Sequence, residues 1–521
     1  WFDKNILTYL AFFLLLFIPL YPKLPIMELL HGYIVRVRLE DFFILSAFVI
    51  LLIQIIRKKA SFKTAVFWPM IIYLSIGFLS VLSGILITKT IPLNRLHIFK
   101  AFLHWLRRVE YFSIFFIFYN GIRNLKDTKI LLALSVLLVI LVSIYGYGQK
   151  YFYWPVYSTM NREFSKGIRL YLTQYARVPS TFGGHYDLAA FLVIFLVLLI
   201  GLFFFTKKKR WKFPILISFL MGYWLLILSA SRTSFIAYIA GLTVLFFVLA
   251  FKKGWPWSAC RWTTVFTFSF FVMIFFGDLS DRFAHFLKLT EIKERWNLDR
   301  LISPLKPSPE RAGFVAYDED ASLVMDITDE RPVPGLKEGE LPPDVYEKIP
   351  DYAKATLSAG LKKEEPVAIE RVFSENAYKY GLSIAIRLDA LWPQAIAGFM
   401  KNPLLGSGYS TLNKEGVVQF TEAESTDNDY LRALGETGLL GFLAFFGIIF
   451  IVLKLIIKSL KKEKDSLLFV FQACFIAFTF GLLVNALYID VFEASKVAFM
   501  FWAITGTLLA GIEKKKAFTE T

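Results

Sequence analysis

Three arginines and one aspartate have the residue types and surroundings needed for chemistry on a phosphorylated substrate. Arg177 begins the stretch Arg-Val-Pro-Ser-Thr-Phe-Gly-Gly-His, and Arg232 lies in Ser-Ala-Ser-Arg-Thr-Ser between two apolar blocks. Arg387 lies in a segment with helical periodicity, and Asp427 begins Asp-Asn-Asp-Tyr-Leu-Arg. A guanidinium binds phosphate through two parallel hydrogen bonds. A carboxylate of suitable geometry accepts the proton of an attacking hydroxyl. Together these residues predict group transfer from an anionic donor to a hydroxyl.

Each of these residues also has a structural interpretation. The Gly-Gly pair before Asp187 is typical of a capped helix start, which the spacing alone favours. An arginine at such a depth costs free energy unless it is paired or lines a polar cavity, so Arg232 is a candidate for a functional site. The alternative is that its side chain extends to the lipid head groups, and its position supports the two interpretations about equally. Arg387 could form a surface ion pair of little consequence. Asp427 or Asn428 could cap the helix that follows.

Several other kinds of site are not supported by the sequence. The five histidines lack an HExxH pattern or the tight spacing of metal ligands, and the chain has no phosphate-binding loop or dinucleotide fingerprint. We therefore expect no metal and no cofactor. The two cysteines, Cys260 and Cys474, fall in a predicted cytoplasmic loop and in an apolar block, so neither is expected in an exported disulfide.

Apolar residues are gathered in blocks long enough to cross a membrane. Of 521 residues, 56% are hydrophobic, above the roughly 45–50% of soluble domains. Runs of about 20 apolar residues predict membrane helices, and we expect an all-α polytopic membrane protein. The twelve predicted spans are 5–22, 41–57, 64–87, 104–121, 128–148, 186–206, 212–230, 233–252, 261–277, 437–457, 466–487 and 491–511.

Basic residues follow every even-numbered span. Cytoplasmic loops of membrane proteins are enriched in Lys and Arg, so this pattern places both termini in the cytoplasm of a cytoplasmic-type, inner membrane. It also explains the net charge of +16 without a nucleic-acid partner. The basic groups are 57–63, 123–129, 207–210, 252–253, 454–464 and 514–516.

The spans divide the chain into three regions. Residues 1–277 hold the first nine spans with short outer loops. Residues 278–436 form a large extracytoplasmic region with an acidic insert at about 300–373, and its pattern turns helical again from about Ser374 until Pro403. Residues 437–521 hold the last three spans and a cytoplasmic tail. Substrates are therefore expected at the outer face.

The chain resembles the O-antigen ligase and polymerase superfamily, membrane glycosyltransferases that use polyprenyl-diphosphate-linked glycans. Four motifs in the same order, spread over most of the chain, carry the resemblance, together with the twelve spans and the large outer loop before the tenth. They are Arg177-x-x-Ser-Thr-Phe-Gly, Ser229-Ala-Ser-Arg232, Asn402-Pro-Leu-Leu-Gly-x-Gly and Asp427-Asn-Asp-Tyr-Leu-Arg-x-Leu-Gly-Glu-Thr-Gly-Leu-Leu-Gly.

The resemblance implies a fold like that of the membrane (GT-C) glycosyltransferases and an inverting, metal-independent reaction in envelope polysaccharide synthesis. Its donor is a polyprenyl (undecaprenyl) diphosphate-linked oligosaccharide, its acceptor a glycan, lipid or protein, and membrane lipid surrounds it. Arg177 and Arg232 match arginines used around the diphosphate, and Arg387 matches one before the Asn-Pro motif. We expect Asp427 and Arg232 to be catalytic. The expected substrate-binding residues are Arg177, Arg387, His185, Asn428 and Tyr430.

Asp427 departs from the family pattern, because ligases usually have a histidine there that is proposed to activate the acceptor. Aspartate is the weaker base unless burial raises its pKa. A polymerase or another oligosaccharide transferase is therefore as well supported as a ligase, and His185 is an alternative base. The rival class is a transporter or flippase of lipid-linked glycans, which predicts charges deep within several spans and often a repeat relating the two halves; neither is clear in the sequence. A third possibility is a structural membrane protein whose acidic outer loop binds partners.

Overall fold

The computed structural model describes residues 2–28, 36–160, 164–172, 176–275, 382–412 and 425–514 of the 521-residue chain. The predicted acidic insert at 300–373 lies outside the described residues. So does most of the outer region expected at 278–436.

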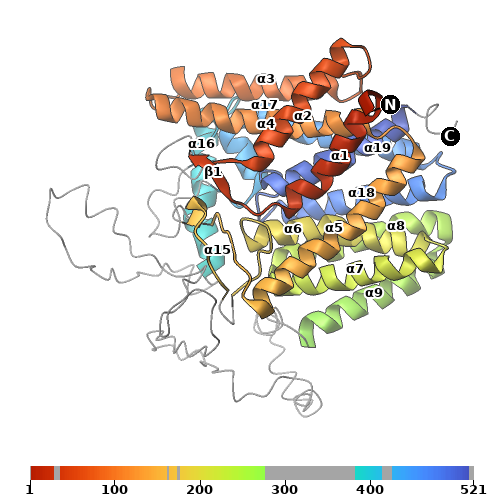
Figure 1. The fold of residues 1–521 in the computed structure, drawn as a ribbon. Coiled ribbons are helices and arrows are strands. Elements are labelled where there is room, and N and C mark those ends of the chain that lie inside the picture. The colour runs from red at the N-terminus through yellow and green to blue at the C-terminus, as the bar shows by residue number, and fades with distance from the viewer. Residues whose placement is uncertain are drawn as a thin grey trace, which may run out of the picture.

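Long helices make up most of the described chain. The first of them begins and the last of them ends at the same end of the bundle (Figure 1). Nine of them are long and apolar enough to cross a membrane, which confirms a polytopic all-α membrane protein. The long helices are α1 (Phe2–Leu20), α2 (Leu39–Ile56), α3 (Phe67–Leu86), α4 (Arg95–Gly121), α5 (Leu125–Phe152), α6 (His185–Phe205), α7 (Lys209–Leu228), α8 (Arg232–Lys253), α9 (Trp255–Phe275), α17 (Asp429–Leu460), α18 (Ser466–Asn485) and α19 (Ser495–Glu513).

The helices α1, α4 and α9 occur where spans are predicted but are not among the nine, so their crossing of the membrane stays a prediction. The start of α4 differs most from the prediction at 104, because the Asn94 side chain caps the helix at Leu96 N, 3.0 Å away. The polar first turns therefore belong to the same helix as the apolar end. Hydropathy alone misses this, since the added turns contain charged residues such as Arg95 and Lys100.

One end of the bundle joins the predicted cytoplasmic ends of several helices. Asp3 in α1 pairs with Arg57 after α2 at 2.6 Å. Asn120 in α4 accepts from Ser61 N at 3.0 Å, and Glu513 in α19 accepts from nearby Ala65 N at 3.1 Å. These contacts bring the start of α1 and the ends of α2, α4 and α19 to one end of the bundle, as the alternation requires for these helices. The side of the membrane remains a prediction.

The opposite end is held by buried polar contacts among the end of α1, the loop before α6 and the start of α19. Lys496 donates from Nζ to the carbonyls of Pro19, Tyr21 and Thr181 at 3.1, 2.7 and 2.7 Å. Thr181 donates to the carbonyl of Pro19 at 2.6 Å. These bonds tie the Ser-Thr-Phe-Gly motif to the ends of α1 and α19, so part of that motif is structural.

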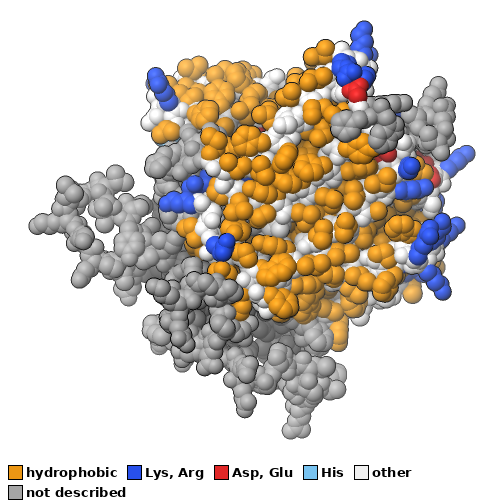
Figure 2. Space-filling view, viewed as in Figure 1, with side chains coloured by type: hydrophobic (Ala, Val, Ile, Leu, Met, Phe, Trp, Pro, Cys, Tyr) orange, Lys and Arg blue, Asp and Glu red, His pale blue; other side chains and the backbone are white. Residues whose placement is uncertain are grey.

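The outer surface matches a membrane environment. Figure 2 shows hydrophobic side chains across the middle of one face, with Lys and Arg gathered toward its two edges. The helices α6 and α19 are the most enclosed of the candidate spans. Both cysteines are free. Cys474 is buried in α18, in the apolar block where it was predicted, whereas Cys260 is exposed in α9 and not in the predicted loop.

Several short elements lie outside the long helices. The strands β1 (Pro25–Glu28) and β2 (Arg36–Arg38) form an antiparallel hairpin between α1 and α2. After the large outer region, α15 (Leu382–Ile386), a π-helical turn (Arg387–Leu391) and α16 (Trp392–Lys401) follow without a break. Such turns within helices are frequent at functional sites, and this one begins at Arg387.

The Asn-Pro-Leu-Leu-Gly motif fills a break in α17. At Gly438 the backbone leaves the helix, with φ 65° and ψ −169°. The freed backbone groups bond to the motif instead: Ser407 N donates to Gly435 O at 2.9 Å, and Leu439 N donates to Pro403 O at 2.9 Å. Two motifs far apart in sequence therefore form one backbone junction, and α17 starts before the predicted span at 437.

Gly438→Ala should destabilise the protein by about 1–3 kcal/mol through backbone conformation alone. A Cβ at Gly438 would also lie 2.4 Å from the Leu404 carbonyl. Gly447→Ala, in the same helix with no atom within 4 Å of the added Cβ, is the matched control. Thermal unfolding in detergent should show a lower midpoint for the first variant only. Equal midpoints would show that the junction does not restrict this backbone.

Candidate functional site

The four sequence motifs meet at one end of the bundle. Val178 N donates to Leu228 O at 3.2 Å, which joins the Arg177 motif to the hairpin before α8. Asn485, the last residue of α18, donates to the Ser234 hydroxyl at 3.1 Å. Asp429 N, at the start of α17, donates to Ala486 O at 3.0 Å. The segment 486–494, between α18 and α19, therefore lies beside the motifs and is called the connecting segment below.

Arg387 and Asp427 form an ion pair beside the connecting segment. Arg387 Nη2 lies 3.0 Å from Asp427 Oδ2, and the side chains are 4% and 30% exposed. The guanidinium also lies over the Tyr488 ring, 4.1 Å from its centroid, which is a cation–π contact. Ser425 donates to Asp427 Oδ1 at 2.7 Å. The aspartate is thus the accessible member of a fixed pair.

Arg232 lies at the start of α8 and is exposed. It makes no ion pair among the described residues, but it is close enough to influence the Tyr488 hydroxyl electrostatically. Burial raises the pKa of Tyr488, while the charges of Arg387 and Arg232 lower it. The local helix start is fixed without Arg232, because Ser231 caps it at Ser234 N. Its guanidinium is therefore available to a ligand at this end.

Arg177 is next to the histidine predicted as an alternative base. Its Nη1 lies 2.7 Å from Nε2 of His185 and 3.4 Å from the Tyr186 hydroxyl. A guanidinium can only donate, so Nε2 accepts and the imidazole is neutral in this contact. The lone pair that a base would use is occupied, and His185 can act as a base only if Arg177 moves.

Asn428 and Tyr430, predicted to bind substrate, make structural contacts. Asn428 caps α17, accepting from Leu431 N at 2.9 Å, and donates to Leu487 O at 3.1 Å. Asn428 therefore has the structural role that the sequence allowed for it, a helix cap. Tyr430 donates to Leu483 O at 2.7 Å and stacks on Phe446. Substrate contacts of the two side chains stay a prediction.

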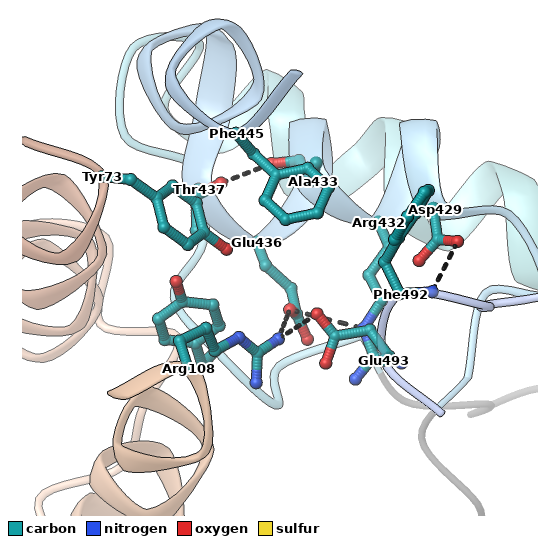
Figure 3. A pocket seen from close by; sticks show the side chains of 11 residues that line it. Tyr73, Arg108, Asp429, Arg432, Ala433, Glu436, Thr437, Phe445, Phe492 and Glu493 are labelled. Atoms are coloured by element: carbon teal, nitrogen blue, oxygen red, sulfur yellow. Dashed lines mark hydrogen bonds and ion pairs between the residues drawn. The ribbon is translucent and has the colours of Figure 1, made fainter. Parts of the chain in front are cut away.

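A second polar cluster, not predicted from the sequence, lies between α4, α17 and the connecting segment. Figure 3 shows Arg108 directed toward Glu436 and Glu493 around a small cavity, called the charged cavity below. Arg108 Nη2 lies 2.5 Å from Glu493 Oε1 and 3.6 Å from Glu436 Oε2. Arg432 reaches Glu436 at 3.4 Å. The motif Asp-Asn-Asp-Tyr-Leu-Arg-x-Leu-Gly-Glu contains Arg432 and Glu436 at helical spacing, a signal that could have pointed to the cluster.

Asp490 also escaped the sequence prediction, although it lies between the two clusters. Arg432 Nη1 donates to its Oδ2 at 2.9 Å. Burial alone would raise the pKa of Asp490, but Arg432 and hydrogen bonds from residues such as Ser425 outweigh burial and lower it. Burial raises the pKa of Glu493. The two acids of the connecting segment therefore sit in opposite electrostatic environments.

No group of three or more His, Cys, Asp or Glu side chains suited to a metal ion occurs in the described parts of the chain. The fold and its apolar surface define the class: this is a multi-pass, all-helical membrane protein. No family model matches the chain, and no curated protein matches it either. The family resemblance therefore depends on the four motifs and the arrangement of the predicted spans.

Proposed function

We propose that the protein is an O-antigen ligase- or polymerase-like glycosyltransferase. It would move a glycan from a polyprenyl diphosphate donor to an acceptor hydroxyl at the outer face of the cytoplasmic membrane. The observation that supports this most directly is the accessible carboxylate of Asp427, which pairs with Arg387 beside Tyr488, a side chain that the charge of Arg232 also reaches. Diphosphate transfer needs cations at the leaving group and a base at the acceptor.

The ion pair between Arg387 and Asp427 is interpreted as the resting state of the site. Both carboxylate oxygens are occupied, Oδ2 by Arg387 and Oδ1 by Ser425. A diphosphate that binds between Arg232 and Arg387 would compete with Asp427 for the guanidinium of Arg387. Since Arg387 would then turn from Asp427 toward phosphate, donor binding would free the carboxylate to accept a proton.

In the proposed reaction, the acceptor oxygen forms a bond to the anomeric carbon as the bond from that carbon to the diphosphate oxygen breaks. The acceptor proton passes to Asp427, and the bonding electron pair leaves with the polyprenyl diphosphate. Arg177, Arg232 and Arg387 would stabilise its charge electrostatically. Attack opposite the leaving group inverts the anomeric centre, and apolar outer faces of the helices would hold the lipid tail.

Arg232→Ala should reduce glycan transfer about 10²–10³-fold, the usual loss for one group that stabilises developing charge. The protein should stay folded, because the exposed guanidinium has no ion pair among the described residues. Transfer is measured in liposomes with a synthetic polyprenyl-diphosphate oligosaccharide and glycan, lipid or peptide acceptors. Arg261→Ala, at the other end of the bundle in α9, is the matched arginine control. Unchanged transfer by Arg232→Ala would remove this residue from the donor site.

Movement of a lipid-linked glycan is the second candidate function. Buried charges on α4 and α17, such as Arg108 and Glu436, favour it, since transporters carry ionisable residues inside their spans. The same liposomes distinguish the two candidates. Wild type that forms no product with any acceptor but moves the donor between leaflets would replace the transferase by a flippase.

A further inference from the structure

The carboxylate of Asp490 accepts hydrogen bonds from residues on both sides of Asp427. Asp490 is 9% exposed, and the loop before α17 passes over it. The donors to its two oxygens, with donor–acceptor distances, are Ser425 Oγ (2.9 Å), Thr426 N (3.1 Å), Thr426 Oγ1 (3.1 Å), Asn428 N (2.7 Å) and Arg432 Nη1 (2.9 Å). Charged acceptors make the stronger class of hydrogen bond.

These bonds determine the backbone conformation at the predicted base. The amides bonded to Asp490 belong to Thr426 and Asn428, directly before and after Asp427. Between them Asp427 has a left-handed backbone with φ 49°, a conformation that non-glycine residues adopt at a cost. The surrounding bonds must offset this cost, and Asp490 accepts most of them.

The Ser425 hydroxyl connects the two carboxylates directly. Its oxygen lies 2.9 Å from Asp490 Oδ2 and 2.7 Å from Asp427 Oδ1, and one hydroxyl proton serves one acceptor at a time. A purely structural ion pair with Arg432 would need none of the contacts to 425–428. The contacts therefore extend from Asp490 to the side chain of Asp427 as well as to its backbone.

We infer that Asp490 is the positioning residue that holds Asp427 in place for its contact with Arg387 and with an acceptor hydroxyl. The inference rests on the proposed function for its role in transfer, but the geometry it claims can be measured without transfer. Asp490 itself contacts no reacting atom in this assignment. It acts through the loop 425–428.

Thiol labelling measures the geometry. In a Cys260→Ser background, Asp427→Cys places one accessible thiol in the loop, because Cys474 is buried. Adding Asp490→Asn replaces one of the two acceptor oxygens by an NH₂ group, which faces hydrogen-bond donors and cannot accept from them. We expect alkylation of the thiol at 427 to become about ten-fold faster, since losing one charged hydrogen bond frees a loop by about this factor. Full-length protein in detergent is used.

Leu404→Cys is the matched control for this experiment. Leu404 is 58% exposed and lies in the neighbouring loop without a bond to Asp490. Its labelling rate should be the same with Asp490 and with Asp490→Asn. An unchanged rate at 427 in Asp490→Asn would overturn the positioning role. If Asp490→Asn does not fold, Ser425→Ala, which removes only the bridging hydroxyl, takes its place with the same expected direction.

Transfer assays then separate the two proposals. Asp490→Asn should lower kcat about ten-fold with little change in the donor KM, because the donor arginines stay in place. Asp490→Glu, which keeps the charge but lengthens the side chain, should restore the ion pair with Arg432 but not kcat. The two proposals can therefore fail separately. If the wild type shows no transfer while Asp490→Asn still speeds labelling at 427, the proposed function is contradicted and the positioning role is supported.

Discussion

Asp427→Asn should lower the turnover of glycan transfer about 10²–10⁴-fold, the range expected for loss of a general base. The amide has the size of the carboxylate but cannot take up the acceptor proton. Donor affinity should be retained or improved, since Arg387 would lose the carboxylate that competes with the diphosphate. Steady-state transfer and binding of a fluorescent donor measure the two effects separately.

The matched control for this prediction is Glu463→Gln, an acid-to-amide change beyond the far end of α17 from Asp427. It should leave both turnover and donor affinity unchanged. Asp427→Asn with wild-type turnover would place the base elsewhere, and His185 would be tested next by His185→Gln. Weaker donor binding in Asp427→Asn would contradict the competition between the carboxylate and the diphosphate for Arg387.

The helical spans could be predicted because their signal is local. A run of apolar residues such as that in α6 needs about 20 positions to cross the membrane and contains its own evidence. The predictions differ from the structure where polar residues continue a helix, as before Gly438 in α17 and at Arg95 in α4. Hydropathy reports contact with lipid, whereas the turns before Gly438 hold polar side chains buried in protein, such as Arg432 and Glu436. In α4, Arg95 is exposed and belongs to a polar helix start.

The partners within the site could be predicted only in part. The sequence points to both Arg387 and Asp427 as site residues. Their pairing depends on how the π-helical turn lies against the start of α17, which no spacing in the sequence reveals. Asp490 and Glu493 were missed because they lie near the boundary of two apolar runs, where an acid normally marks a loop. Their partner residues come from α4 and α17, far away in the chain.

Arg432→Met should destabilise the folded protein by about 3–5 kcal/mol, the usual effect of removing one partner from a buried ion pair. The change leaves two buried carboxylates, Asp490 and Glu436, without the guanidinium that reaches them at 2.9 and 3.4 Å. Isothermal or thermal unfolding in detergent, followed by tryptophan fluorescence, measures the loss. Arg432→Lys should fall between, because an ammonium keeps the charge but cannot bond both acids in the same planar geometry.

Arg57→Met provides a matched control in the same chain. Arg57 pairs with Asp3 at 2.6 Å, but the side chains are 47% and 43% exposed, so its loss should change stability by at most about 1 kcal/mol. Adding Glu436→Gln to Arg432→Met should restore part of the stability, because it removes one of the two buried carboxylates that have lost the Arg432 guanidinium. Equal effects of Arg432→Met and Arg57→Met would mean that water reaches the charged cavity freely. The charges of the cavity would then not count as buried in the membrane, and the observation that favours a flippase would be lost.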